Sequence, residues 1–451
     1  MSVRDLWTAV AAAWMLSLPL AGAATAQSRP PDIVVFIADD HSVLDSSVYG
    51  STDIRTPSMD RLSRAGLTFD RAFVASPSCA PSRAAFLTGL MPARNGAEAN
   101  HSKPRPDIRT LPAYLQALGY EVVAFGKVAH YKYTADYGFD HFAHDTFHDD
   151  VAIANGIAWL RQRKPGKPLC ILFGTNWPHV PWPEAGADAR PSPRVPATHV
   201  DTPETREMRA QYYAAVGRMD SELGQAYDAA REVLGPNTFF LFSADNGAQW
   251  PFAKWTLYDA GIRTPMIAVW PGRIAAGGRT DAMVSWVDLL PTLIEVAGGQ
   301  APPGLDGRSF AGVLLGRTTT HRGRIFTTHT SDPPMNVYPI RSVRTADWKY
   351  IRNLQPERTF TTHIDRGKPV DGAGYFASWR KKAATDPAAA AVVARYHQRP
   401  AEELYDLRAD PEERRNLAGD PRHASRLRTL RAELDAWMTA SGDAGRVPGE
   451  P

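Results

Sequence analysis

The chain has 451 residues, enough for one large domain or two unequal ones. Hydrophobic residues make up 43% and charged residues 22%, which is typical of an ordinary globular protein. The formal net charge of +3 is too small to indicate a nucleic-acid partner, and neither a basic block nor a zinc-type spacing is present. No feature of the sequence indicates an oligomeric state.

The first residues have the pattern of a secretory signal. Arg4 precedes an apolar stretch at residues 6–20, and Ala-Thr-Ala at residues 24–26 is a small-x-small cleavage pattern. We therefore expect export to the periplasm or out of the cell, with cleavage after Ala26. A membrane anchor is the alternative, but the apolar run is short for a bilayer and two prolines soon follow it. No later segment is long and apolar enough to span a membrane.

Five unbroken apolar runs alternate with helical patterns between residues 31 and 316. Unbroken runs indicate strands that are buried on both faces of a parallel sheet. The runs lie at residues 33–37, 122–125, 169–173, 239–242 and 266–270, and the clearest helical stretches at 110–118 and 206–234. The sequence therefore predicts an α/β sandwich with a central, mostly parallel sheet.

After residue 316 the pattern changes to short strands and polar, alanine-rich segments. We predict a smaller α+β subdomain at residues 317–451 that packs on the first domain. Its expected elements are short exposed strands at 342–344 and 348–352, a segment at 403–407 and a last helix near 422–438.

Polar side chains follow four of the five runs, at the point where each run ends. Parallel sheets bind ligands at the carboxyl ends of their strands, so four such clusters predict one shared site. Any one cluster could be loop chemistry or a helix cap, but four together are hard to explain in that way. In chain order they contain Asp39 and Asp40, Lys127 and His130, His179, and Asp245 and Asn246.

Three carboxylates and an amide oxygen in these clusters suit Ca²⁺ or Mg²⁺ better than zinc. They belong to Asp39, Asp40, Asp245 and Asn246. One such pair alone is commonly an Asx turn or a helix cap. Lysines nearby can neutralise a transferred anionic group and histidines can protonate a leaving atom, although Lys254 is weakly indicated by its position.

Only two cysteines are present, enough for one disulfide that a chain of this size does not need. Cys170 lies inside an apolar run and is expected to be part of the core. Cys79 lies where Pro81 suits the first turn of a helix at residues 82–90, with the preceding residue outside the helix. A helix N-terminus favours an anion, and Arg83 lies one turn on. A capping cysteine beside a surface arginine is an equally weighted alternative.

Residues 79–83 (Cys-Ala-Pro-Ser-Arg), followed by Leu-Thr-Gly at 87–89, resemble the signature of the type I sulfatases. Similar resemblances occur along essentially the whole mature chain, at residues 32–40, 56–62, 254–265 and 403–417. The resemblance implies an alkaline-phosphatase-like fold. It also implies that a dedicated enzyme, reading Cys-x-Pro-x-Arg, oxidises Cys79 to Cα-formylglycine.

In that family the hydrated aldehyde supplies two hydroxyls, of which one attacks sulfur and the other later expels sulfate. An ordinary serine would stop at a stable sulfate ester.

The resemblance implies a Ca²⁺ site, with Mg²⁺ allowed by the ligand types, made by Asp39, Asp40, Asp245, Asn246 and the modified Cys79. It implies that Arg83 and Lys127 support the nucleophile, that His130 orients or deprotonates the gem-diol, and that His179 and Lys254 face the sulfate, with His179 as the acid.

Within the family the pattern is closest to the heparan N-sulfatase (sulfamidase) branch. His130 stands three residues after Lys127, where that branch usually has two, and this spacing is more like that of iduronate sulfatases. Lys254 stands where sulfamidases can use arginine. These departures leave open which leaving group the enzyme accepts, and they do not affect the predicted transfer of the sulfuryl group.

The leading prediction is hydrolysis of sulfate from an N- or O-sulfated glucosamine of heparan-type glycans. The alternatives are an O-sulfatase for another small ester, a phosphoester or phosphonate-ester hydrolase of the same fold, and a non-catalytic glycan-binding protein. The sequence leaves open the sugar, the sulfate position and exo or endo action. Residues 341–399, including His363, are expected to be mainly a solvated loop region, with a role in substrate entry as the weaker alternative.

Overall fold

The computed structural model describes residues 29–144, 151–185 and 193–447. The expected signal segment, up to Ala26, lies outside the described residues. Among the residues that are described, no helix is both long and apolar enough to cross a membrane.

An eight-stranded, mostly parallel sheet forms the centre of the fold. Across the sheet its strands are β5 (His141–Ala143), β4 (Glu121–Gly126), β6 (Leu169–Gly174), β1 (Asp32–Ala38), β7 (Thr238–Ala244), β8 (Met266–Val269), β2 (Leu67–Phe69) and β9 (Gly278–Thr280). In β1, Val34 pairs in parallel with Ile171 on one side and Phe240 on the other. Every residue of β1 is buried, as its unbroken apolar run predicts. The fifth predicted strand, β8, runs antiparallel to β7.

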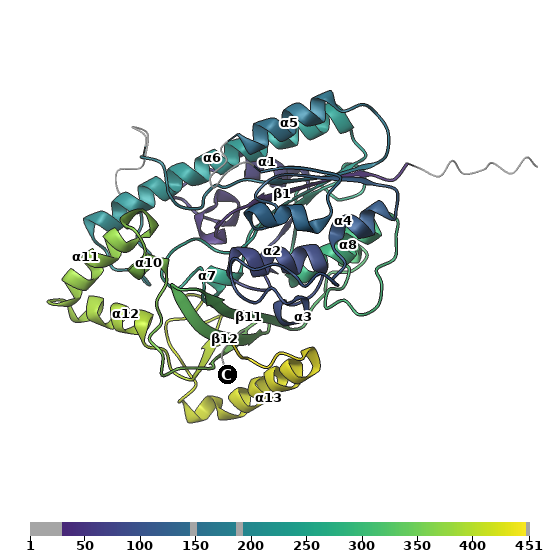
Figure 1. Ribbon diagram of the computed structural model, residues 1–451. Helices are drawn as coiled ribbons and strands as arrows, with labels where there is room; N and C mark the ends of the chain where they lie inside the picture. Colours follow the sequence, from purple (N-terminus) through teal and green to yellow (C-terminus); the bar gives the residue numbers. More distant parts are fainter. Residues whose placement is uncertain (1–28, 145–150, 186–192, 448–451) are drawn as a thin grey trace, which may run out of the picture.

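Helices cover both faces of this sheet (Figure 1). One face carries α1 (Pro57–Ala65), α5 (Ala152–Gln162) and α6 (Pro203–Leu234), and the other carries α2 (Cys79–Thr88), α4 (Leu111–Gln116) and α8 (Leu289–Val296). The predicted helices at 110–118 and 206–234 correspond to α4 and α6. The remaining short elements are α3 (Pro92–Asn95), α7 (Asp259–Ile262), α9 (Ala311–Leu314) and a two-stranded pair of β3 (Ala72–Phe73) and β10 (Val284–Ser285).

A second, four-stranded antiparallel sheet follows in the chain. Its strands are β11 (Ile325–Asp332), β12 (Asn336–Arg344), β13 (Trp348–Asn353) and β14 (Glu402–Asp406), in that order. The last helix, α13 (Ala424–Ser441), packs on it through Leu430 and Leu434 against Val343 and Tyr350. The strands that the sequence predicted as exposed are therefore largely buried, because α13 covers them.

Residues 341–399 are not a solvated loop region, which corrects the prediction for this segment. They contain β13, α10 (His363–Arg366), α11 (Ala373–Ala383) and α12 (Pro387–His397). The helices carry buried aromatic residues, among them Trp379 and Tyr396, which join the main hydrophobic core. The two sheets together confirm the predicted α/β sandwich with a smaller C-terminal α+β part, while the boundary at residue 316 stays a prediction.

Candidate active site

The carboxyl ends of β4, β6, β1 and β7 meet at one edge of the large sheet. Backbone hydrogen bonds continue the ladder just past the strands: Asp39 donates to the carbonyl of Trp177 and Asp245 to the carbonyl of Ala38, both at 3.1 Å. The side chains that follow these strands therefore start from fixed backbone positions in one small volume.

Two glycines bring Lys127 into this volume. A Cβ on Gly126 would lie 2.2 Å from the carbonyl oxygen of Gly174, and a Cβ on Gly174 would lie 2.2 Å from the carbonyl of Lys127. Gly126 also has a φ of +76°. Because only glycine fits both positions, β4 and β6 approach closely where they end, and the Lys127 side chain enters the site.

Asp40 adopts a left-handed backbone conformation, with a φ of +64°. Its backbone N–H donates to Asp245 Oδ1 at 3.0 Å, which holds this uncommon conformation in place. The turn directs the Asp40 carboxylate toward two donors: Asn246 Nδ2 and Lys254 Nζ each donate to it at 2.7 Å. Lys254, weakly indicated by sequence position, is thus brought to the cluster.

Cys79 lies at the start of α2, as predicted, and is 1% exposed. The helix begins at Cys79 itself, so the expectation that Ala80 lies outside the helix was wrong. Pro81 still falls in the first turn, where its missing N–H costs no hydrogen bond. Cys79 Sγ lies 3.5 Å from Asp39 Oδ1 and 3.6 Å from Lys127 Nζ. Burial raises the pKa of the Cys79 thiol well above its usual value, although Lys127 acts in the opposite direction.

Arg83 is fully buried and binds carboxylates rather than Cys79 itself. Its Nε donates to Asp245 Oδ2 at 2.8 Å, and its Nη2 lies 3.3 Å from Asp39 Oδ1. It thereby fixes the ends of β1 and β7 relative to α2. Its role is to hold the acidic residues around position 79.

Three buried carboxylates face three buried cations in this cluster. Burial opposes ionisation of Asp39, but Lys127, His179 and Arg83 together hold the pKa of Asp39 well below its usual value. Burial raises the pKa of Asp245 to about 7, and the neighbouring carboxylates add to this effect. An additional cation between the carboxylates would favour their ionised forms.

The donor set fits a hard divalent cation. Ligand atoms of Asp39, Cys79 and Asp245 lie within 4.8 Å of one another, as do those of Asp40, Cys79 and His179. The Oδ1 atom of Asn246 is buried and has no hydrogen-bond partner in the described part of the chain. Carboxylate and amide oxygens are the ligands that Ca²⁺ and Mg²⁺ prefer.

The two predicted histidines have different positions. His179 Nδ1 lies 2.5 Å from the carbonyl oxygen of Val180, so Nδ1 carries the hydrogen. Its Nε2 points to the site, 3.7 Å from Asp40 Oδ2. His130 packs edge-on against His101 at 4.6 Å, and no hydrogen bond joins it to Cys79 in the structure as described. Burial first, and then Lys127, lower the pKa of His130 well below its usual value, so its ring is neutral.

Sequence reasoning missed two residues that support the nucleophile position. Asn100 Oδ1 accepts a hydrogen bond from the Ala80 backbone N–H at 3.0 Å, and Asn100 Nδ2 donates to Asp332 Oδ2 at 2.9 Å. Neither residue follows a strand of the large sheet. Asp332 ends β11 in the C-terminal part, and no local pattern signals this long-range contact.

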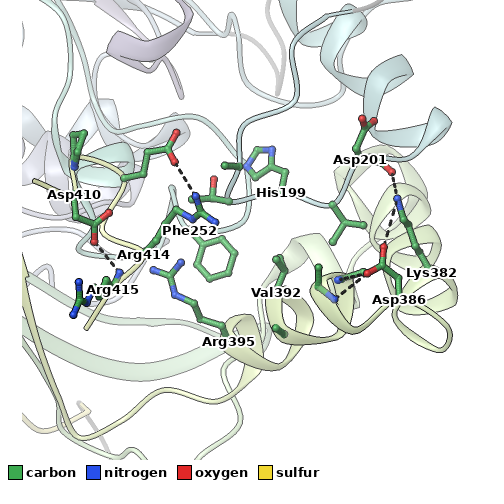
Figure 2. Close-up of a pocket in the computed structure, with 18 of the residues that line it drawn as sticks. His199, Asp201, Phe252, Lys382, Asp386, Val392, Arg395, Asp410, Arg414 and Arg415 are labelled. Atoms are coloured by element: carbon green, nitrogen blue, oxygen red, sulfur yellow. Dashed lines mark hydrogen bonds and ion pairs between the residues drawn. The ribbon is translucent and has the colours of Figure 1, made fainter. Parts of the chain in front are cut away.

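A cavity of about 1000 Å³ lies elsewhere, beside Phe252 and α12 (Figure 2). None of the predicted site residues lines it. Its lining contains basic side chains such as Arg395 and Arg414, but also acidic ones such as Asp410 and Asp386, so its charge favours no class of ligand. The chemistry therefore belongs to the strand-end cluster rather than to this larger cavity.

Two family models match the chain. The model described as Sulfatase matches residues 31–299. The model described as N-sulphoglucosamine sulphohydrolase, C-terminal, matches residues 247–368. An ulvan-active sulfatase of Formosa agariphila is 32% identical, over 93% of this chain and 82% of the relative. The human N-sulphoglucosamine sulphohydrolase is 28% identical, over 92% of this chain and 91% of the relative.

Solved structures share the fold at lower identity. A protein in complex with its substrate D-glucosamine-2-N,6-O-disulfate superposes with a TM-score of 0.73 at 21% identity, over 94% of this chain and 100% of that chain. A phosphonate monoester hydrolase of Agrobacterium radiobacter superposes with a TM-score of 0.69 at 16% identity, over 91% and 96%. The family model, which covers more than half of the residues, and the relative that is 32% identical show that the chain belongs to the sulfatase family.

Proposed function

We propose that this protein hydrolyses sulfate from a sulfated sugar, with position 79 as the nucleophile after Cys79 has been converted to formylglycine. The observation that carries the proposal is the environment of Cys79, buried at the start of α2 between Asp39 and Lys127. Burial disfavours the thiolate there, so the encoded thiol is a poor nucleophile. A hydrated aldehyde at the same place supplies hydroxyls instead.

In the first step a hydroxyl oxygen at position 79 bonds to sulfur, and the bond from sulfur to the sugar oxygen or nitrogen breaks. His179 supports this step, because its Nε2 faces the site and, when both ring nitrogens carry hydrogen, the Nε2 proton passes to the leaving atom and leaves a neutral ring with its hydrogen on Nδ1. Lys127 and Lys254 place two buried positive charges beside the transferred group. The leaving sugar departs with the proton.

In the second step the other hydroxyl at position 79 loses its proton, the bond from carbon to the sulfate oxygen breaks, and the aldehyde returns. The ring of His130, which is neutral because burial and then the charge of Lys127 lower its pKa, is the group we assign to orienting the gem-diol or accepting its proton. Asp39, Asp40, Asp245 and Asn246 would hold a divalent cation, Ca²⁺ or Mg²⁺, which when bound supplies positive charge to the sulfate oxygens.

The substrate is proposed from the relatives. The curated relatives include an ulvan-active sulfatase and an N-sulphoglucosamine sulphohydrolase, and both names concern sulfated carbohydrate. The C-terminal match to the second of these favours an N- or O-sulfated glucosamine. We further propose that the chain is exported, with cleavage after Ala26, and that a formylglycine-generating enzyme is its maturation partner.

A substrate panel tests the proposal. It contains N-sulfoglucosamine, 6-O-sulfo-N-acetylglucosamine, a simple aryl sulfate and an aryl phosphate, with Cys79→Ala as the control for contaminating activity. We expect sulfate release from a sugar and none from the control. Preference for the phosphate ester would replace the proposal with the phosphoester or phosphonate-ester alternative, whose fold is shared.

A further inference from the structure

Two histidines meet on one buried carboxylate beside the active site. Asp332 is 1% exposed; its Oδ1 lies 3.3 Å from His101 Nε2, and its Oδ2 lies 3.5 Å from His363 Nε2. Oδ2 also accepts hydrogen bonds from Asn100 Nδ2 at 2.9 Å and Trp255 Nε1 at 2.7 Å. These residues come from separated segments of the chain, so only the complete fold assembles the cluster.

The cluster adjoins the catalytic residues on two sides. Through Asn100 it is one hydrogen bond away from the backbone N–H of Ala80, the second residue of α2. Through Trp255 it adjoins Lys254, whose Nζ lies 4.9 Å from the centre of the indole ring. His363 stacks on the same indole at 5.4 Å, with an angle of 20° between the ring planes.

Both imidazoles remain open to a ligand. The exposed fraction of the side chain is 54% for His101 and 29% for His363. Burial opposes ionisation of Asp332, but the neighbouring rings of His101 and His363 hold its pKa well below the usual value. Because a carboxylate can only accept, it favours the form of each ring that carries the hydrogen on Nε2, the nitrogen nearest to it. In a neutral ring Nδ1 is then an acceptor, and neither Nδ1 has a protein partner among the described residues.

We propose that His101 and His363 bind hydroxyl groups of the sugar that carries the sulfate, and that Asp332 positions both rings. The inference rests on the proposed function, since it assigns a second binding element to the same site. A sugar hydroxyl can donate to each Nδ1, whereas a simple aryl leaving group has no such donors. The pair therefore makes the enzyme selective for sugar sulfates over aryl sulfates.

Kinetics of His101→Ala and His363→Ala with both substrate classes test the inference. We expect a rise in KM of about tenfold or more per variant for the sulfated sugar, because each lost hydrogen bond serves substrate binding. The kcat for the sugar and the kcat/KM for the aryl sulfate should stay within about twofold of wild type. Asp332→Asn should raise KM for the sulfated sugar more than KM for the aryl sulfate, whereas its effect on position 79 through Asn100 should lower kcat for both substrates equally.

Two variants separate hydrogen bonding from packing. His363→Phe keeps a ring over Trp255 but has no ring nitrogen. Its KM for the sulfated sugar should therefore rise as much as that of His363→Ala. His141→Ala is the matched control, because His141 also stacks on a tryptophan, Trp159, but at the edge strand β5. This variant should have wild-type KM and kcat for both substrates. Three results would each overturn the inference: an equal rise in KM for sugar and aryl sulfates, an unchanged KM for the sugar, or a His363→Phe variant with the wild-type KM for the sugar.

Equilibrium binding of N-sulfoglucosamine to the Cys79→Ala protein gives a readout that does not depend on turnover. Weaker binding after His101→Ala in this background supports the inference, and unchanged binding contradicts it. If the wild type releases sulfate from no substrate, the proposed function fails, while this binding measurement still decides the role of the two histidines. A loss seen only with a doubly sulfated sugar would show that the rings bind an anion, which overturns the assignment to hydroxyls.

Discussion

Replacing Asp259 by asparagine removes the charge at the centre of a buried ion cluster between the two sheets. Asp259 begins α7, directly after the loop that carries Lys254. Its carboxylate lies 3.0 and 2.9 Å from two nitrogens of Arg344 in β12, and 2.5 Å from Lys349 Nζ in β13. Lys349 also lies 2.8 Å from Glu413, so the cluster joins the loop to the C-terminal sheet.

The expected loss of unfolding free energy in Asp259→Asn follows from the burial of the three charged side chains. The exposed side-chain fraction is 14% for Asp259, 5% for Arg344 and 0% for Lys349. Asparagine keeps one acceptor oxygen but leaves the two buried cations without their shared counter-charge, although Glu413 still pairs with Lys349. Breaking a buried pair in this way costs about 3–5 kcal/mol of unfolding free energy. We therefore expect a lower midpoint of urea unfolding, with unfolding monitored by tryptophan fluorescence.

The pH dependence supplies a second check. Burial opposes ionisation of Asp259, but Arg344 and Lys349 hold its pKa below the usual value. A carboxylate with a lowered pKa in the folded state stabilises fully above its unfolded pKa and loses this contribution as the pH falls. The difference between wild type and Asp259→Asn should therefore shrink as the pH falls below about 4.

Asp435→Asn is the matched control, since Asp435 pairs with Arg352 but its side chain is 54% exposed. Exposed pairs of this kind contribute less than about 1 kcal/mol. A urea midpoint for Asp259→Asn equal to that of Asp435→Asn would refute the reasoning from burial.

Three further predictions concern the active site. Cys79→Ala should abolish turnover and leave the urea midpoint near that of wild type, and retained activity would move the nucleophile elsewhere. Lys127→Ala should lower kcat by about 100-fold or more, because it removes a buried charge next to position 79; a change in KM alone would contradict this role. A chelator should lower both activity and the thermal midpoint, and Ca²⁺ in about 100-fold excess over its dissociation constant should restore about 2.7 kcal/mol. An unchanged midpoint and activity after chelation would speak against a metal site.

The large sheet was predictable because its strands are buried on both faces, which leaves unbroken apolar runs in the sequence. The site was predictable from the same pattern, since Asp39, Lys127 and Asp245 come directly after such runs and His179 lies in the loop that follows β6. The direction of β8 was not predictable, because a fully buried strand has the same apolar pattern in either orientation.

The support around Cys79 could not be predicted, for a physical reason. Asn100 and Asp332 are far apart in sequence and act through hydrogen bonds that form only because the segment at Asn100 lies beside the end of β11. The burial of β12 and β13 was missed because α13, the helix that covers them, lies far along the chain. The guanidinium of Arg83 bridges two carboxylates from separate strands, which its position one turn after Cys79 could not predict.

Mass analysis of the peptide that contains position 79, taken from fully active protein, tests the central claim most directly. The account predicts the loss of mass expected when the thiol-bearing carbon of Cys79 becomes an aldehyde, with the modified fraction rising in proportion to activity. Fully active protein in which Cys79 remains an unmodified cysteine would contradict it.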